Sequence, residues 1–269
     1  MLKNNYHTHV KYCNHATGGV EDYVLEAIKL GFNEIGITDH APVPTSFMTN
    51  KEYIENYCHQ NMTDDIVPIY LNDIKEAKEK YASQIKIYSG FETEFIPSKL
   101  DYYKKLRNSV EYLNLGIHYF PDENGKIINC YADITYKNLY RYVDIAIQAM
   151  ETGLFNTLVH PELFMYKYSN INNDRKFDDE AIFQSRRICE AAIKNNVYLE
   201  VNSNGIKGDL WLYPSKEFWT IAKEYKDLKI IIGADAHSIS ALSNENVINT
   251  IKFCNELGLN ISDKMEINH

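Results

Sequence analysis

Features that are scarce or missing in this 269-residue sequence narrow the classes of protein to which it can belong. The sequence has no run of about 18 apolar residues, the length that a membrane-spanning helix requires. Its first residues also lack the apolar core of a signal peptide. We therefore expect a cytoplasmic protein that has no membrane partner.

Paired cysteines and excess positive charge are missing as well. The five cysteines are odd in number, widely spaced and without a Cys-x-x-Cys pair, which is typical of reduced thiols and not of a disulfide framework. The net charge is −9, and this argues against a nucleic-acid partner, whose phosphates need a basic surface. An anionic small molecule remains compatible, because bound metal ions reverse the sign of the local field.

Short apolar segments alternate with helical patterns along the whole chain. Seven strand-like segments are rich in β-branched and apolar residues and end in a polar residue, at 5–9, 34–40, 85–92, 113–118, 157–160, 197–202 and 229–235. Helical spacing is found at 20–30, 70–81, 137–152 (after the potential N-cap Thr135), 178–193, 214–222 and 245–257. This alternation predicts parallel β/α units. Single α/β barrels commonly reach about 250 residues, so we expect one domain over 1–269.

The segments that follow four of the predicted strands are long. They lie at 41–68, 119–134, 161–177 and 203–211. In a parallel β/α barrel the loops after the strands form the catalytic face. The long segments should therefore surround an active site at the C-terminal ends of the strands.

Histidines gather where the predicted strands end. Seven of the nine lie in this pattern: His7, His9, His15, His40, His118, His160 and His237. Residues at i and i+2 of a strand point to the same face, so His7 and His9 should present two imidazoles side by side. A single histidine would more often be a surface residue, but imidazoles clustered at one end of a sheet need a common partner.

Two carboxylates complete this set. Glu92 ends the third predicted strand and Asp235 ends the seventh, two positions before His237. Imidazole nitrogens together with carboxylate oxygens suit Zn²⁺, Mn²⁺ or Fe²⁺. Nine ligands exceed what one ion needs, so the sequence predicts two or three divalent metal ions with a bridging carboxylate.

These motifs together resemble the polymerase and histidinol phosphatase (PHP) superfamily. The matching stretches are His7-Thr8-His9, His15, Thr38-Asp39-His40, Glu92, Gly116-Ile117-His118, His160-Pro161 and Asp235-Ala236-His237. Within the superfamily the chain is similar to the histidinol-phosphatases of histidine biosynthesis, in length and in the segment Gly-Ile-Thr-Asp-His-Ala-Pro at 36–42. The resemblance implies a single PHP-type domain with the fold of a distorted, TIM-like (β/α)₇ barrel and a trinuclear metal site.

The resemblance also implies how the ligands divide among the ions and which reaction they support. The implied sets are His7, His9, Glu92 and Asp235 for the first ion, Glu92, His118 and His160 for the second, and His15, His40 and His237 for the third. The implied reaction is the hydrolysis of L-histidinol phosphate to L-histidinol and phosphate. Three dications with two carboxylates leave about +4 of charge, which attracts a phosphate dianion. A bridging hydroxide would exist near neutral pH and attack phosphorus in line.

Candidates for catalysis and substrate contact follow from the same motifs. Glu92 would act as the bridging carboxylate, and Asp39 precedes a ligand, so it is a candidate for acid/base, supporting or structural roles. A metal-bound water is the alternative proton source. The substrate has a cationic amine and an imidazole, for which Glu162 and Tyr166 are candidate contacts; Lys207 and Arg175 are candidates for the phosphate.

Two other interpretations stay open at this point. One is another PHP phosphoesterase, such as a nucleotide phosphatase, a phosphodiesterase or an exonuclease. The other is a non-catalytic domain that keeps the fold and the metals as a scaffold, although no ligand position is missing here. The sequence does not determine the oligomeric state.

Overall fold

A single parallel sheet organises the molecule. The computed structural model describes residues 2–43, 58–174, 176–207, 210–211 and 213–267. The sheet has seven strands in the order β1-β2-β3-β4-β7-β8-β11. Their bounds are β1 Asn4–Asn5, β2 Glu34–Ile37, β3 Lys86–Thr93, β4 Tyr112–Leu115, β7 Thr157–Leu158, β8 Tyr198–Asn202 and β11 Ile230–Gly233. The prediction of a distorted (β/α)₇ TIM-like barrel is confirmed.

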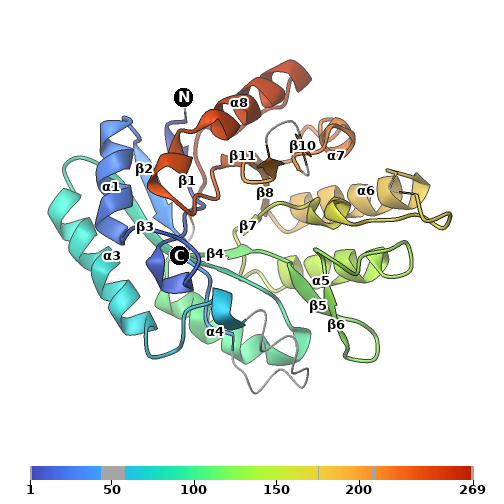
Figure 1. Ribbon diagram of the computed structural model, residues 1–269, viewed down its shortest axis with the longest axis horizontal. Coiled ribbons are helices and arrows are strands. Elements are labelled where there is room, and N and C mark those ends of the chain that lie inside the picture. Colours follow the sequence, from blue (N-terminus) through green and yellow to red (C-terminus); the bar gives the residue numbers. More distant parts are fainter. Residues whose placement is uncertain (1, 44–57, 175, 208–209, 212, 268–269) are drawn as a thin grey trace.

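One helix follows each of these strands along the chain and covers the outside of the sheet (Figure 1). The helices are α1 Val20–Lys29, α3 Val67–Tyr81, α4 Leu100–Ser109, α5 Leu139–Glu151, α6 Asp179–Lys194, α7 Lys216–Ala222 and α8 Glu245–Leu257. Strands β4 and β8 are buried along their whole length. This is typical of parallel strands that have helices on one face and a filled interior on the other.

The first and last strands close the barrel through few backbone contacts, which we call the seam. An isolated parallel bridge joins Thr8 to Ala236, and the backbone N–H of His9 donates to the carbonyl of Ala236 at 2.9 Å. The side-chain oxygen of Asn5 accepts from the backbone N–H of Ala234, also at 2.9 Å. Histidines of the first segment and ligands of the last are thereby brought to neighbouring positions.

The structure corrects the predicted helices in two places. Helix α4 was not predicted, because it buries only Tyr103 and Leu106 and has no side-chain cap at its N-terminus. Helix α5 begins at Leu139 after Asn138, so Thr135 is not its N-cap. The carbonyl of Thr135 instead accepts the N–H groups of Asn138 and Leu139 in the preceding turn.

Two of the long segments contain short hairpins of their own. The pair β5 (Tyr119–Pro121) and β6 (Ile127–Asn129) follows β4, and the pair β9 (Ile206–Lys207) and β10 (Leu210–Trp211) follows β8. Both lie on the side of the barrel where the strands end. Among the described residues, no helix is long and apolar enough to cross a membrane.

Tyrosines and the C-terminal tail fill the opposite end of the barrel. Tyr6, Tyr88, Tyr112 and Tyr198 form a buried cluster, the tyrosine layer, with Ile231 and Met265. The hydroxyl of Tyr112 crosses the interior and donates to the carbonyl of Tyr6 at 2.8 Å. Met265 is 2% exposed, and its sulfur accepts from the Thr157 hydroxyl at 3.0 Å. The tail therefore closes the amino end of the barrel.

We expect Met265→Ala to destabilise the fold by about 2–5 kcal/mol, the usual range for truncating a buried methionine, because a cavity would remain under the tyrosine layer. Urea unfolding followed by circular dichroism measures this change. Lys264→Ala is the matched control, since Lys264 is the exposed neighbour in the same tail. A loss no larger than that of the control would show that the tail does not contribute to the core.

Candidate metal centre

All nine predicted ligands lie at the carboxyl ends of the strands or in the loop after the first strand. The structure brings their nitrogen and oxygen atoms together into adjoining groups. Glu92, fully buried at the end of β3, lies between them.

The first group joins the two ends of the chain across the seam. The Nε2 atom of His9 lies 3.1 Å from Asp235 Oδ1 and 3.3 Å from Glu92 Oε2. The Nε2 atom of His7 lies 3.2 Å from Glu92 Oε2 and 3.0 Å from His9 Nε2. The four side chains predicted to hold the first ion are thus in mutual contact.

The second group uses the other oxygen of Glu92. Glu92 Oε1 lies 2.9 Å from His160 Nε2 and 3.5 Å from His118 Nε2. Each carboxylate oxygen therefore faces a different group of imidazoles. A bridging carboxylate requires this arrangement.

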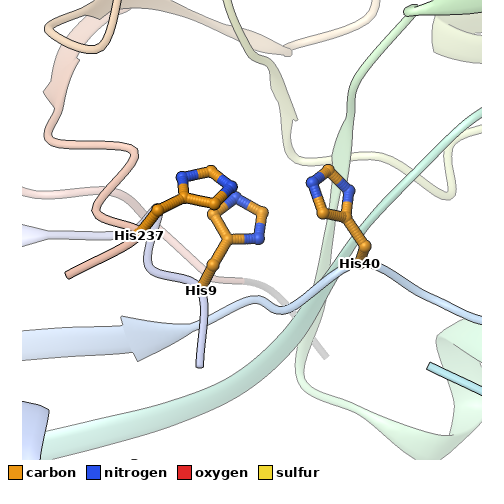
Figure 2. A group of neighbouring side chains, drawn as sticks. All are labelled: His9, His40 and His237. Atoms are coloured by element: carbon orange, nitrogen blue, oxygen red, sulfur yellow. The ribbon is translucent and has the colours of Figure 1, made fainter. Parts of the chain in front are cut away.

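The third group contains the three predicted histidines and brings His9 beside them. Nitrogens of His9, His40 and His237 lie within 4.8 Å of one another, and Figure 2 shows the rings of His9 and His237 close together with His40 facing them. His15 joins this group through His237, with 3.0 Å between their Nε2 atoms. His9 thus also approaches His40 and His237, which its motif position did not indicate.

The chemistry of this donor set fits divalent cations. Glu92 Oε2 and Asp235 Oδ1 are buried and accept no hydrogen bond from the described part of the chain. Burial opposes ionisation of both carboxyls, but the surrounding imidazoles, His40 for Glu92 and His7 for Asp235 foremost, hold their pKa values well below the usual range. Burial also lowers the pKa of His237 to about 3, which leaves a neutral imidazole with a lone pair. Converging lone pairs and buried negative charges need a cation between them.

Two further carboxylates, Glu94 and Glu200, orient the histidines from behind. Glu200 Oε1 lies 2.8 Å from His7 Nδ1, and Glu94 Oε1 lies 2.8 Å from His118 Nδ1. Such a bond places the hydrogen on Nδ1 and turns the Nε2 lone pair toward the centre. Neither residue was predicted as a site residue. Two signals in the sequence could have identified them. Glu200 is a charged residue within the predicted strand 197–202, and Glu94 lies two positions after Glu92.

Glycines on neighbouring strands leave the space that the carboxylates occupy. A Cβ atom at Gly116 would lie 2.1 Å from Glu92 Oε1, and one at Gly233 would lie 1.7 Å from Glu200 Oε1. Real Cβ atoms do not approach so closely, so any larger residue would displace these carboxylates. Both glycines are therefore needed for the positions of the Glu92 and Glu200 carboxylates.

Asp39 lies behind the ligands and not in the cavity above them. Its carboxylate is buried and accepts the backbone N–H groups of Cys13 at 3.1 Å and His40 at 3.0 Å. Its Oδ1 lies 3.5 Å from the Nδ1 atom of His9. These contacts support a positioning role for Asp39 better than the acid/base role, for which the side chain would have to reach the substrate.

A cavity of about 470 Å³ opens above the ligands. Besides the metal-binding candidates, its lining consists of polar and aromatic side chains from the surrounding loops: Gln60, Tyr119, Asn129, Tyr131, Asn204 and Tyr213. Tyr131 and Tyr213 were not predicted as site residues, because their loops carry no motif that distinguishes them from packing aromatics.

Neither of the two residues predicted to contact the amine and imidazole of the substrate, Glu162 and Tyr166, is among the described residues that line the cavity. Glu162 is 1% exposed, and its Oε1 accepts the Trp219 indole N–H at 2.6 Å and the Ser215 backbone N–H at 3.2 Å, so it does not line the cavity. Burial raises the pKa of Glu162 to about 7. Tyr166 lies one layer away and packs edge-on against Tyr131 with ring centroids 5.2 Å apart.

The two predicted phosphate contacts fall where little is described. Arg175 lies outside the described residues. The backbone of Lys207 belongs to β9, but its side chain also lies outside the described part of the chain.

Comparisons with known proteins place this arrangement in a family context. The sequence matches the PHP domain over residues 5–204. A histidinol-phosphatase from Bacillus subtilis is 24% identical over 273 residues, covering 88% of this chain and 94% of that protein.

Solved structures share the fold at low sequence identity. A histidinol phosphate phosphatase from Lactococcus lactis, crystallised with zinc, L-histidinol and phosphate, covers 99% of this chain and 100% of its own, with a TM-score of 0.69 and 18% identity. A structure from Listeria monocytogenes has a TM-score of 0.74 and 22% identity, covering 90% of this chain and 98% of its own.

Proposed function

Because this chain belongs to the PHP domain family, we propose that it hydrolyses a phosphate monoester, L-histidinol phosphate, at a centre of three divalent metal ions. The observation that carries the proposal is the position of Glu92, whose two oxygens face different groups of imidazoles at 2.9–3.5 Å. The choice of substrate is supported by the Bacillus subtilis relative and by the Lactococcus lactis structure with L-histidinol and phosphate.

The proposed ligands hold the ions in the three groups described above. His7, His9, Glu92 and Asp235 would hold the first ion, Glu92, His118 and His160 the second, and His15, His40 and His237 the third, with His9 close enough to contribute there. Zn²⁺, Mn²⁺ and Fe²⁺ all suit these donors. Bound ions supply an activated water and stabilise the charge that develops on the phosphate.

The residues of the chain supply orientation and a shielded site. Glu94 and Glu200 fix the tautomers of His118 and His7, and Asp39 fixes the position of His9. The ligand side chains at the floor of the cavity are mostly buried, so the reaction would proceed largely away from bulk water. The alternative role for Asp39 is that of proton donor to the leaving group.

A small substrate agrees with the rest of the molecule better than a nucleic acid does. The cavity of about 470 Å³ is in the range for a metabolite, and no lysine or arginine is among the described residues that line it. The net charge of −9 also disfavours a polyanionic partner. We extend the proposal to one domain over 1–269 and to a cytoplasmic location, for which the four unpaired, buried cysteines of the described part provide support.

Phosphate release is the test of this proposal. Purified protein should release phosphate from L-histidinol phosphate with a kcat/KM above that for sugar and nucleotide monoesters. Equal rates on all of these esters would remove the substrate assignment and leave the phosphatase class. Metal analysis of protein purified without chelator should find two or three transition ions per chain, and fewer than two would contradict the multinuclear centre.

A further inference from the structure

Two tyrosines that belong to no metal-binding motif line the cavity beside the second group of ligands. Tyr131 follows the β5–β6 hairpin, and Tyr213 lies between β10 and α7. The Tyr131 ring lies 5.9 Å from the ring of His118, and the Tyr213 ring lies 5.9 Å from the ring of His160. We call these two residues the tyrosine pair.

Tyr131 is held in place by contacts on several sides. Its ring is nearly parallel to that of His118, with 14° between the planes. The Tyr166 ring meets it edge-on, with 86° between the planes. Its backbone N–H donates to the side-chain oxygen of Asn129 at 2.8 Å. The ring orientation is therefore set before any substrate binds.

Tyr213 is fixed still more firmly. It is 6% exposed, and a Cβ atom at Gly205 would lie 2.3 Å from its ring, so only glycine permits this packing. The segment that follows is anchored by Glu162, which accepts hydrogen bonds from the Ser215 backbone and the Trp219 indole. This buried carboxylate thus acts as a positioning residue for the Tyr213 side of the cavity.

The charge of the cavity suggests what the two rings recognise. In the proposed centre the ions offset the charges of Glu92 and Asp235 on its floor, and its described lining contains no lysine or arginine. An anionic leaving group would find no opposite charge there among the described side chains. A positively charged alcohol portion would meet the two tyrosine rings that line the cavity, and aromatic rings attract cations through their quadrupole.

We propose that the tyrosine pair selects phosphate monoesters whose alcohol portion carries a positively charged amine or imidazole, by holding that cation against the two ring faces beside His118 and His160. This inference rests on the proposed function and adds the residues that determine which esters are accepted. It assigns specificity to the loops after β4 and β8, while the motif residues provide the chemistry common to all esters.

The test compares esters with and without a cation, of which 3-aminopropyl phosphate and propyl phosphate share the same carbon chain. L-Histidinol phosphate and 3-aminopropyl phosphate carry a positive charge, whereas propyl phosphate carries none. In Tyr131→Leu and Tyr213→Leu, kcat/KM for the two cationic esters should fall roughly 5- to 30-fold, mainly through KM, the factor that corresponds to about 1–2 kcal/mol of cation–π attraction. The fall for propyl phosphate should be much smaller.

Controls separate recognition from damage to the centre. Tyr131→Phe and Tyr213→Phe keep the ring faces and should retain most of the preference for cationic esters. Tyr140→Leu alters a tyrosine at the start of α5 that does not line the cavity, and should leave the preference as it is in the unaltered protein. The metal content of each variant is measured, because loss of an ion would lower the rates on all esters together.

The possible failures are distinguishable. If both leucine variants lose the same factor on all three esters, or lose nothing, the tyrosine pair does not determine specificity and the inference is overturned. If the unaltered protein releases phosphate from none of the esters, the proposed function itself fails. Retained preference for cationic esters in the double variant Tyr131→Leu/Tyr213→Leu would likewise overturn the inference.

Discussion

Replacing Glu92 by glutamine is expected to reduce kcat/KM for L-histidinol phosphate by at least about 10³-fold and to release at least one metal ion per chain. Glutamine keeps the volume of the side chain but has one oxygen and no charge. Glu92 Oε2 faces His7, His9 and His40, whereas Oε1 faces His118 and His160. The substitution therefore removes the oxygen that faces one of the groups and the negative charge that both groups share.

Steady-state kinetics together with metal analysis by mass spectrometry measure this effect. Glu190→Gln makes the same chemical change on the exposed face of α6 and serves as the control. Thermal unfolding of Glu92→Gln should remain cooperative, because the tyrosine layer and the strands do not depend on this carboxylate. A variant with full metal content and an unchanged rate would exclude Glu92 as the shared ligand.

Replacing Glu200 by glutamine is expected to weaken metal retention and lower kcat/KM by about 10- to 100-fold, although Glu200 belongs to none of the three ligand groups. This is the usual effect of removing a carboxylate that orients a metal-binding histidine. Glu200 accepts from His7 Nδ1 at 2.8 Å, from the His160 backbone N–H at 3.2 Å and from the Asn202 amide at 2.8 Å. Its loss would release the orientation of His7.

The measurement that separates this role from simple destabilisation is the metal dependence of the rate. If Glu200 orients His7, added Zn²⁺ or Mn²⁺ should restore part of the activity of Glu200→Gln at concentrations that the unaltered protein does not need. Glu94→Gln should behave in the same way through His118. Activity that stays low at saturating metal with an intact fold would contradict the orienting role.

Local sequence patterns predicted the barrel and the ligand set because both depend on short stretches of sequence. Six of the seven predicted strand segments end in a proposed ligand, as 85–92 does at Glu92, so strand periodicity and site chemistry coincide in the chain. Helix α6 likewise begins after Asp178, whose side chain accepts the Ala181 N–H as an N-cap should.

These local patterns could not predict contacts between segments that are distant in the sequence. Glu200 meets His7 across 193 positions, and only the barrel geometry makes them neighbours. Tyr213 becomes a cavity residue through Gly205 and Glu162, which share no motif with it. Helix α4 was not predicted for a different reason. Its two buried residues are too few to produce a clear helical periodicity of apolar residues.

The seam between the first and last strands also links metal binding to the folding of the protein. Asn5 and Ala234, which join across it, are 229 positions apart. The proposed ligands His7 and His9 stand on one side and Asp235 on the other, so an ion held by all three would act as a cross-link that closes nearly the entire chain into a loop. In the chain-entropy account, cross-links that close long loops restrict the unfolded ensemble most. Metal loading and completion of the barrel would then be coupled, since the ligand set of the first ion is complete only when the last strand brings Asp235 beside His7 and His9.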